Sequence, residues 1–235
     1  MPTVSQDTFD PSKLDTPDYF PHYAYREPAN LELLGELGPT FACSAGHVIY
    51  GHGNSNYCYM VQSGIIAATL HGLDDFSRQS ALFLEGSLFL EPSALSGLPS
   101  NIAYRAVKPS KLVRISRDDL QDAMSRDPAV FKAVLTAITM KLNAAHEQLR
   151  ESATLDVRAR IYFMLLGIAE TCSEDEGDGW HRITVQLTQQ NMSDMLGVNR
   201  VTVNTALRDL YEKGVVRKQG RQYAVHDAKG ILRTR

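Results

Sequence analysis

The chain has 235 residues, of which 43% are hydrophobic and 22% charged, and its formal net charge is −3. This composition is typical of a soluble globular protein, and the length allows one large domain or two small ones with a buried core. No apolar run approaches the ~18–20 residues of a membrane span, so we expect no membrane partner. The first residues carry acids and prolines instead of a basic segment followed by an apolar one, and indicate no secretory signal.

The cysteines indicate the cellular compartment of the protein, and the distribution of charge indicates the kind of partner that it binds. Cys43, Cys58 and Cys172 are too few and too scattered for a disulfide scaffold or an iron–sulfur cluster, which favours the reducing cytoplasm. Residues 180–235 hold ten Lys/Arg and four Asp/Glu, a local balance of +6 that leaves −9 on the rest of the chain. The asymmetry predicts a C-terminal module that meets a polyanion, although a chance imbalance of surface charge gives the same numbers.

The first half of the chain predicts an N-terminal extension followed by a β-domain. Residues 1–38 are rich in Pro, Asp and Tyr, with weak periodicity. Residues 39–126 predict an antiparallel β-roll, a jelly roll of the cupin type, because short apolar runs alternate with glycines. The runs are HVIY (47–50), YCYMVQSG (57–64), IIAATLHG (65–72) and SALFLEGSLFL (80–90). Gly64, and Gly72 with Asp74 and Asp75, are candidate hairpin turns.

Residues 127–153 predict one long helix and a hinge. Asp127-Pro128 opens the helix, after a short helix capped by Ser116 or Asp118. Apolar residues recur at alternating spacings of four and three, which is the seam of a coiled coil. The seam consists of Phe131, Leu135, Ile138, Leu142, Ala145 and Leu149. A second stripe consists of Val130, Val134, Ala137, Lys141 and Ala144. We expect one stripe to dock on the β-roll and the other to pair with a twin helix in a homodimer; a stripe that only docks on the roll is the alternative.

Residues 154–235 predict a winged helix–turn–helix domain. A helix over residues 156–172 precedes an acidic loop, SEDEGDG (173–179), and a strand, HRITVQ (181–186). In the stretch that follows, Thr188 caps a short helix, Gly197 ends it and Asn199 caps a second helix. The two helices share an apolar cluster of Met192, Met195, Leu196, Val198, Val203, Leu207 and Leu210. A plain helical hairpin is the alternative interpretation.

The solvent face of the second helix is the candidate DNA-reading surface. Val201, the one apolar side chain on this face, suits the methyl group of thymine, and Arg200 suits guanine or phosphate. The segment EKGVVRKQGRQYAV (212–225) predicts a β-hairpin that turns near Gly220 and contacts phosphates. The candidate DNA-binding residues are Asn199, Arg200, Val201, Thr202, Asn204, Thr205, Arg208, Lys218 and Arg221.

This order of parts, from about Phe41 to Ala224, resembles the CRP/FNR superfamily of bacterial transcription regulators. The most specific stretches are LDVRARIYFMLL (155–166) and LTQQNMSDMLGVNRVTVNTAL (187–207). The resemblance implies a cytoplasmic homodimeric activator without catalytic activity, which binds palindromic double-stranded DNA and contacts RNA polymerase. It also implies a small-molecule effector between the β-roll and the long helix, acting on the hinge near Ala153–Asp156.

Departures from the better-known members of the superfamily change the expected ligands. The cyclic-AMP branch has Gly-Glu-Leu and then an Arg-Ser pair that holds the phosphate, whereas GSLFLEP (86–92) and Ser100-Asn101 stand here, so we expect no cyclic nucleotide. No cysteine precedes Cys43, so the cysteine cluster of the oxygen-sensing branch is missing. The usual Arg-Glu-Thr-Val reads RVTV (200–203), and loss of the Glu that accepts from cytosine N4 implies A/T-rich half-sites of the TTAA-like kind, in place of TGTGA or TTGAT.

A closer likeness is to the CprK-type regulators of reductive dehalogenation, which bind chlorinated phenols. SLFLEPSALSGLPSNIAYRA (87–106) and GVNRVTVNTAL (197–207) carry this likeness. Lys141 matches a lysine that contacts the phenolic oxygen in that subgroup, and Glu91 stands where a second lysine is expected. A carboxylate there implies a neutral phenol, a catechol or a cation in place of a phenolate. The candidate effector-binding residues are Tyr57, Tyr59, Glu91, Tyr104 and Lys141.

Other interpretations of these residues stay open. The spacing of Lys141 also fits a lysine that extends to solvent, and the three tyrosines also fit core or surface positions. A haem that senses carbon monoxide or nitric oxide, with His71 as axial ligand, is the alternative to the aromatic effector. A metal-dependent cupin enzyme needs a His-x-His pair, which the sequence lacks, so we expect no metal and no resident cofactor. Cys43 and Cys58 have no activating Lys, Arg or CxxC partner and are expected to be structural thiols instead of redox switches.

Overall fold

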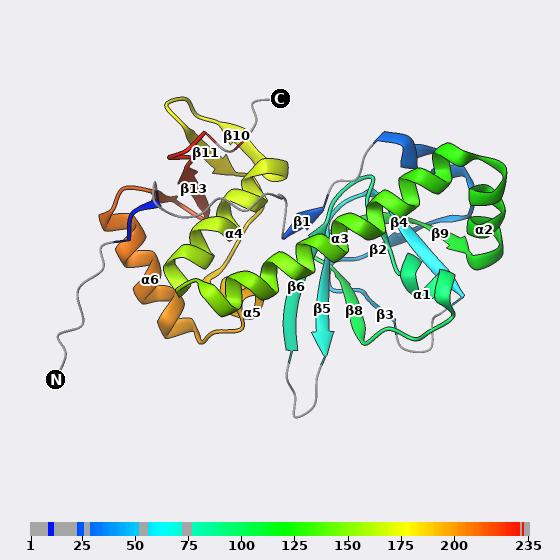
Figure 1. Cartoon of the computed structure of the whole chain (residues 1–235), viewed down its shortest axis with the longest axis horizontal. Helices are drawn as coiled ribbons and strands as arrows, with labels where there is room; N and C mark the ends of the chain where they lie inside the picture. Colours follow the sequence, from blue (N-terminus) through cyan, green and yellow to red (C-terminus); the bar gives the residue numbers. More distant parts are fainter. Residues whose placement is uncertain are drawn as a thin grey trace. The chain divides into compact units, whose positions relative to one another are not determined.

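The computed structural model of the chain describes residues 9–11, 23–25, 29–51, 56–71, 77–230 and 232. The chain divides into a unit of residues Pro21–His146, here called the roll unit, and a unit that joins Met1–Phe20 to Glu147–Arg235, here called the C-terminal unit. The long helix α3 (Pro128–Thr154) begins in the roll unit and ends in the C-terminal unit (Figure 1). The expected fold class, a β-roll, a long helix and a C-terminal helix–turn–helix domain, is confirmed.

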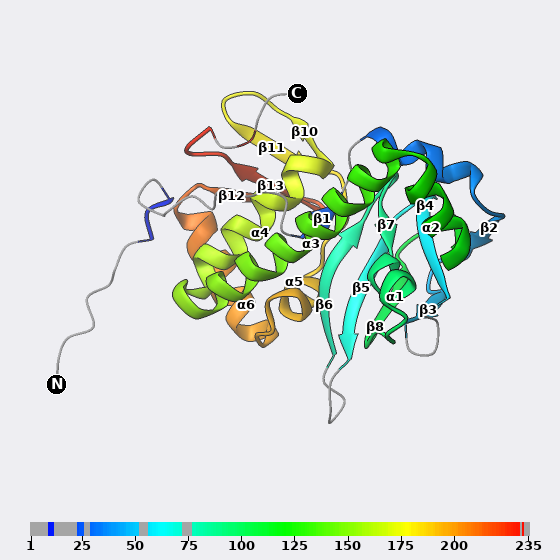
Figure 2. The same cartoon turned by 45° about the vertical axis from the view of Figure 1, so that its right-hand side comes forward.

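The strands of the roll unit form two sheets (Figures 1 and 2). One sheet has the order β1-β6-β5-β8-β3 and the other β2-β9-β4-β7. The first is built from β1 (Ala24–Tyr25), β6 (Ser77–Phe83), β5 (Ile66–His71), β8 (Ile102–Ala106) and β3 (Val48–Tyr50). The second is built from β2 (Thr40–Cys43), β9 (Ser110–Ser116), β4 (Tyr57–Ser63) and β7 (Leu88–Phe89). Neighbouring strands are antiparallel, except that β1 runs parallel to β6.

The prediction of a hairpin at Gly64 is wrong. The strands on its two sides, β4 and β5, belong to different sheets, so the chain crosses from one sheet to the other at this point. Gly64 has φ 109°, and a Cβ there would lie 2.1 Å from Ser110 Oγ, so the crossing needs glycine for both its backbone angle and its space. The second candidate turn, Gly72 with Asp74 and Asp75, lies outside the described residues.

Helices cover one face of the second sheet. The 3-10 helix η2 (Ala29–Glu36), α1 (Glu91–Ser96), α2 (Arg117–Arg126) and the first half of α3 share a buried apolar cluster with strands β4, β7 and β9. Ser116 caps α2, because its hydroxyl accepts from Asp119 N at 3.1 Å. The stripe expected to dock on the roll is buried, with Val134, Ala137 and Ala144 fully enclosed. α3 is therefore fixed to the roll by this stripe.

The C-terminal unit is organised around α4 (Val157–Cys172), which begins at its N-cap Asp156 and is buried over almost its whole length. The other elements are β10 (Ser173–Asp175), β11 (Trp180–Ile183), α5 (Gln189–Leu196), α6 (Arg200–Glu212), β12 (Val216–Gln219) and β13 (Gln222–His226). The expected acidic loop at 173–179 is wrong in its first part, because Ser173–Asp175 pairs with β11 as a strand.

A residue of the N-terminal extension belongs to the core of the C-terminal unit. Phe9 is 7% exposed and its ring meets that of Tyr162 edge-on, with the centroids 5.9 Å apart. The Tyr162 hydroxyl donates to His226 O at 2.9 Å and accepts from Ala228 N at 3.3 Å. Because the same extension supplies β1 to the roll unit, both units take part of their structure from it.

Among the described helices, none has the length and apolar character that crossing a membrane requires.

Candidate DNA-binding surface and effector site

Local hydrogen bonds fix the turn between α5 and α6. The Thr188 hydroxyl accepts from Asn191 N and the Asn191 side chain accepts from Thr188 N, both at 3.0 Å, which forms a capping box at the start of α5. Gly197 ends α5 with φ 65°, and the side chain of Asn199 accepts from Thr202 N at 2.8 Å to start α6. The three predicted boundary residues are confirmed in these roles.

Buried side chains lock the two helices together. Met192, Met195, Leu196, Val203, Leu207 and Leu210 are all at most 2% exposed. Arg160 on α4 adds a polar contact that the sequence analysis missed. Its guanidinium is buried and donates to Leu196 O at 2.6 Å, so it satisfies one of the free carbonyl groups at the end of α5. The helix pair is consequently held by both packing and a buried charge-assisted hydrogen bond.

The outer face of α6 is exposed where the sequence places the DNA contacts. Val201 is 76% exposed, so its side chain is accessible to a molecule outside the domain. Arg200, Asn204, Thr205 and Arg208 are also exposed, whereas Thr202 is half-buried. The side chains of Asn199 and Asn204 already accept hydrogen bonds from Thr202 and Gln189, so part of their capacity is used within the domain. Arg200 and Val201 lead the exposed face.

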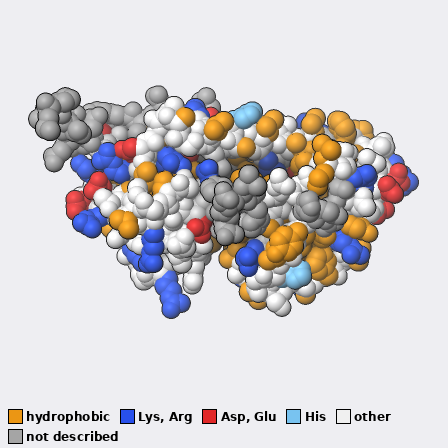
Figure 3. All heavy atoms as spheres, turned by 90° about the horizontal axis from the view of Figure 1, so that it is seen from below, with side chains coloured by type: hydrophobic (Ala, Val, Ile, Leu, Met, Phe, Trp, Pro, Cys, Tyr) orange, Lys and Arg blue, Asp and Glu red, His pale blue; other side chains and the backbone are white. Residues whose placement is uncertain are grey.

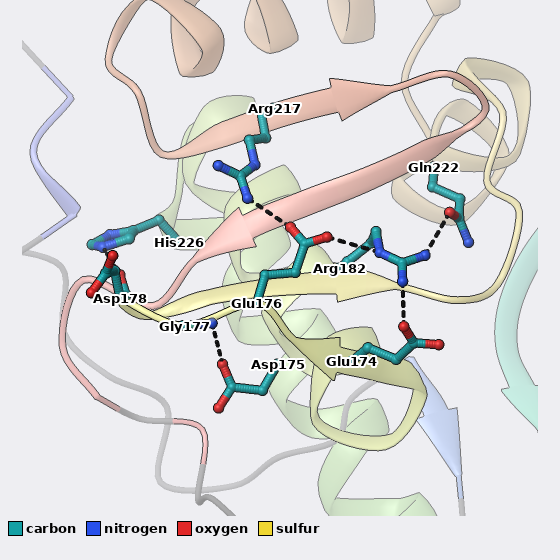
Figure 4. A network of polar contacts seen from close by, with 9 residues as sticks. All are labelled: Glu174, Asp175, Glu176, Gly177, Asp178, Arg182, Arg217, Gln222 and His226. Atoms are coloured by element: carbon teal, nitrogen blue, oxygen red, sulfur yellow. Dashed lines mark hydrogen bonds and ion pairs between the residues drawn. The ribbon is translucent and has the colours of Figure 1, made fainter.

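Strands β12 and β13 form the predicted hairpin, with Gly220 at its turn (φ 61°). Lys218 and Arg221 are exposed beside the turn, and Lys218 Nζ lies 5.6 Å from the centre of the Tyr223 ring. In Figure 3, Lys and Arg side chains are distributed over the C-terminal unit at the left, in agreement with the charge balance of the sequence. The third basic residue of the hairpin, Arg217, is engaged in a network of side chains within the sheet (Figure 4).

Lys141 and Glu91 form a buried ion pair in the roll unit. Lys141 Nζ donates to Glu91 Oε1 and to Leu88 O, each at 2.6 Å, and lies 5.5 Å from the centre of the Phe83 ring. The side chain of Glu91 is fully buried and that of Lys141 is 16% exposed, so the lysine does not extend to solvent. Among the described residues, Glu91 Oε2 is buried without a hydrogen-bond partner. The residue before it, Leu90, has φ 64°, a strained angle for leucine, at a position that fixes where Glu91 begins α1.

Aromatic side chains from both sheets form a cluster, and Phe83 of this cluster lies against Lys141. The Phe89 ring stacks between Tyr59 and Tyr104, at centroid distances of 5.3 and 4.6 Å, and Phe83 meets Tyr104 edge-on at 5.7 Å. Burial, with a smaller effect of the Glu91 charge, raises the pKa of Tyr104. Tyr104 is thus close enough to Glu91 and Lys141 to be affected by their charges, whereas Tyr59 joins the same cluster through Phe89. The structure does not bring Tyr57 there, because it is half-buried and its ring faces the Arg114 guanidinium at 4.9 Å.

Two of the residues that stand at the expected cyclic-phosphate site, Ser87 and Ser100, make hydrogen bonds within the protein. Ser87 is fully buried, donates to Tyr25 O at 2.7 Å and accepts from Leu84 N at 3.2 Å, so its hydroxyl anchors β1. The Ser100 hydroxyl accepts from Ile102 N at 3.2 Å, and Asn101 is exposed. None of these three side chains carries a positive charge that would balance a phosphate.

The predicted seam of α3 faces solvent in this single chain. Phe131, Leu135, Leu142 and Leu149 are 49%, 51%, 53% and 69% exposed, and Ala145 is exposed as well. Ile138, the remaining member of the seam, packs partly against the roll core. A row of large apolar side chains on one helix face, opposite a stripe that is already buried, is an uncovered apolar surface.

The histidines and cysteines of the described segments give no support for a metal site or a redox switch. In the described segments, no three His, Cys, Asp or Glu side chains gather in a way that would hold a metal ion. The side chain of His71, on which the haem alternative depends, lies outside the described residues, as does His52. All three cysteines are buried, and burial raises the pKa of Cys43 and of Cys58, which makes them poor thiolates.

Comparison with known proteins identifies two domains in the same order as the two units. Residues 41–127 match the family model of a cyclic nucleotide-binding domain, and residues 159–234 match that of a Crp-like helix-turn-helix domain. A curated relative, the CRP-like cAMP-activated global transcriptional regulator of Mycobacterium tuberculosis (strain CDC 1551 / Oshkosh), is 26% identical over 210 residues. These residues are 88% of this chain and 92% of that protein.

Solved structures share the fold. CprK in complex with OCPA is 18% identical with a TM-score of 0.68, over 88% of this chain and 95% of that one. A mutant of CooA from Carboxydothermus hydrogenoformans is 16% identical with a TM-score of 0.73, over 88% and 96% of the two chains. At these identities the likeness concerns the fold.

Proposed function

This chain belongs to the CRP/FNR family of DNA-binding transcription regulators with an effector-binding domain, and from this premise we propose that its effector is a small aromatic molecule instead of a cyclic nucleotide. In this proposal residues 39–126 bind the effector, residues 127–153 form the dimerisation helix and hinge, and residues 154–235 bind DNA. The protein acts as a cytoplasmic homodimer without catalytic activity.

The observation that carries this proposal is the buried pair of Glu91 and Lys141. Among the described residues, Glu91 Oε2 has no hydrogen-bond donor. Leaving a buried acceptor without a donor costs free energy, and a ligand that donates to this oxygen recovers it. A ligand with an O–H or N–H donor satisfies this oxygen, and an aromatic ring suits the neighbouring rings of Phe89 and Tyr104. A cyclic phosphate instead brings a negative charge toward a buried carboxylate. The site therefore favours a neutral phenol or a catechol, and disfavours a phosphate.

The pair also offers a route from ligand binding to the long helix. Glu91 begins α1 of the roll, whereas Lys141 lies on α3, so the ion pair is one of the attachments of α3 to the roll. A ligand that competes for either group changes the free energy of that attachment. α3 continues along the chain into the hinge at residues 153–156, and a change at the hinge shifts the population of DNA-competent dimers. The size of the response is limited by how much more tightly the ligand binds one state than the other.

Dimerisation and DNA reading complete the proposal. The exposed seam of α3, from Phe131 to Leu149, pairs with the same seam of a second chain and covers both apolar rows. The dimer presents two copies of α6 to successive major grooves, where Arg200 contacts a base or phosphate and Val201 contacts thymine methyl groups. We expect A/T-rich palindromic sites, activation of transcription and contact with RNA polymerase.

A binding panel tests the effector class. Calorimetric titration of the full-length protein compares phenol, catechol, an aromatic quaternary ammonium ion, a nitrophenol that is ionised at neutral pH, and cyclic AMP. We expect binding of phenol or catechol and none of cyclic AMP. Glu91→Gln, which keeps the shape but removes the charge, should weaken catechol binding and strengthen binding of the ionised nitrophenol. Binding of cyclic AMP, or a phenol affinity that Glu91→Gln does not change, would overturn the proposed effector class.

A further inference from the structure

The hairpin of β12 and β13, here called the wing, lies at the edge of its sheet. In the order β10-β11-β13-β12, strand β12 is hydrogen-bonded within the sheet to β13 alone. Lys218 lies on β12 next to the turn and Arg221 lies in the turn itself, and these two are the candidate phosphate contacts of the hairpin. An edge strand with one neighbour twists and shifts more easily than a central strand, so the position of these two cations depends on what else holds β12.

One carboxylate reaches across the sheet to β12. Glu176 lies in the tight turn between β10 and β11, where Gly177 N donates to Asp175 Oδ1 and Trp180 N donates to Gly177 O. Its Oε1 accepts from Arg182 Nε at 2.8 Å, and its Oε2 accepts from an Arg217 terminal nitrogen at 2.6 Å (Figure 4). Glu176 thereby connects the β10–β11 turn to the edge strand on the opposite side of the sheet.

The two arginines have further partners on the same sheet face. The Arg217 guanidinium lies 4.1 Å from the centre of the Trp180 ring, and Arg182 donates to Gln222 at 2.9 Å and to Glu174. Contacts of this kind link all four strands. Hydrogen bonds from Arg217, and more weakly from Arg182, lower the pKa of Glu176, so its carboxylate is charged at neutral pH. Two glutamates balance two arginines in the network, so Arg182 and Arg217 are neutralised within the sheet, whereas Lys218 and Arg221 are not part of it.

We propose that Glu176 is a positioning residue for DNA binding: through Arg217 it fixes the wing so that Lys218 and Arg221 meet the phosphate backbone. The inference rests on the proposed contact between wing and DNA, and it assigns the β10–β11 turn a role in that contact without touching DNA itself. Loss of Glu176 releases Arg217 and loosens the edge strand. The two cations at the turn then lose their fixed positions, and affinity for duplex DNA falls.

Whether loss of Glu176 lowers or raises the affinity for DNA distinguishes a positioning role from a purely electrostatic effect of its charge. Removing a negative charge from a DNA-binding domain by itself strengthens its attraction to DNA, and a freed Arg217 adds a possible phosphate contact. Both of these effects increase affinity and make it more dependent on salt. Positioning by Glu176 predicts the reverse, a lower affinity and a weaker dependence on salt, because contacts are lost from the wing.

The test measures binding of the full-length protein to mixed-sequence duplex DNA over a series of salt concentrations. We expect Glu176→Gln to weaken binding about two- to fivefold, the range of a coupled exposed ion pair, and to lower the salt slope by up to about 1.8, or 0.9 for each of two phosphates. Glu174→Gln is the matched control, because it makes the same charge change on the same sheet face but contacts only Arg182 in the network. It should leave affinity unchanged or slightly raised.

Two further variants show whether Glu176 acts through Arg217. Glu176→Asp keeps the charge but shortens the reach, and should weaken binding like Glu176→Gln. In the Arg217→Gln background, Glu176→Gln should have no additional effect. Binding by Glu176→Gln as tight as that of the Glu174→Gln control would overturn the inference. Failure of the unaltered protein to bind duplex DNA even at low salt would instead overturn the proposed function.

Discussion

Replacing Lys141 by methionine should strongly destabilise the roll unit. The change removes the group that donates to both Glu91 Oε1 and Leu88 O, and leaves a fully buried carboxylate without a charged partner. Removing one member of a buried pair costs about 3–5 kcal/mol. Because the Lys141 side chain is 16% exposed, water can partly reach the vacated position, so we expect the lower end, about 3 kcal/mol. In a domain of this size that loss lowers the melting temperature by on the order of 10 °C.

Thermal melting followed by circular dichroism measures this loss, and a double variant provides the control. In Lys141→Met with Glu91→Leu, both charges are replaced by apolar groups, and stability should return to within about 1 kcal/mol of the original. Glu91→Leu alone should cost less than Lys141→Met alone, because the Lys141 side chain is 16% exposed, so water can partly solvate its charge, whereas Glu91 is fully buried. If Lys141→Met melts with the unaltered protein, or if the double variant is as unstable as the sum of the single ones, the buried pair does not have the energetic role given to it here.

Three other expectations concern the DNA contact, the dimer and alkaline pH. Arg200→Ala should weaken operator binding by about 1–3 kcal/mol if the arginine contacts a base with two hydrogen bonds. An unchanged affinity in a mobility-shift titration would show that Arg200 does not contact DNA. Leu142→Glu places a charge in the exposed seam and should yield monomers in size-exclusion chromatography; an intact dimer would mean that another surface holds the chains together. Burial raises the pKa of Tyr162 from 10.0 to about 12, so the stability that its neutral form contributes is present below pH 10 and is lost as pH rises through 12. Melting curves of Tyr162→Phe should show less of this alkaline loss, and a loss of the same size as in the unaltered protein would assign it to other groups.

The helix–turn–helix was predictable because its determinants are local in sequence. Thr188, Gly197 and Asn199 each act within four residues of their position, as caps or as a left-handed stop. The spacing of the apolar residues on α3 likewise separated the buried stripe from the exposed seam, since a helix places residues by a fixed period. These parts depend on little beyond the nearest turn of chain.

The parts that sequence analysis missed depend on pairing between distant segments. Glu91 and Lys141 are 50 positions apart, so their ion pair has no signature in either stretch. The acidic composition of residues 173–175 indicated a loop, but Glu174 is stabilised in a strand by Arg182 opposite to it. Gly64 between two apolar runs indicated a hairpin turn, but the residues of the turn do not determine whether the two strands pair with each other or join different sheets. The burial of Phe9 against Tyr162 gave no periodic signal at all.

Footprinting on selected DNA tests most directly whether paired α6 helices read the double helix. Duplexes enriched from a random pool by the full-length protein, with and without the phenols of the panel, are cleaved by hydroxyl radicals in its presence. We predict two protected patches about 10–10.5 base pairs apart, centred on an A/T-rich palindrome, both of which fade with Arg200→Ala. Failure to enrich any sequence under either condition, or a single patch without symmetry, would contradict the account.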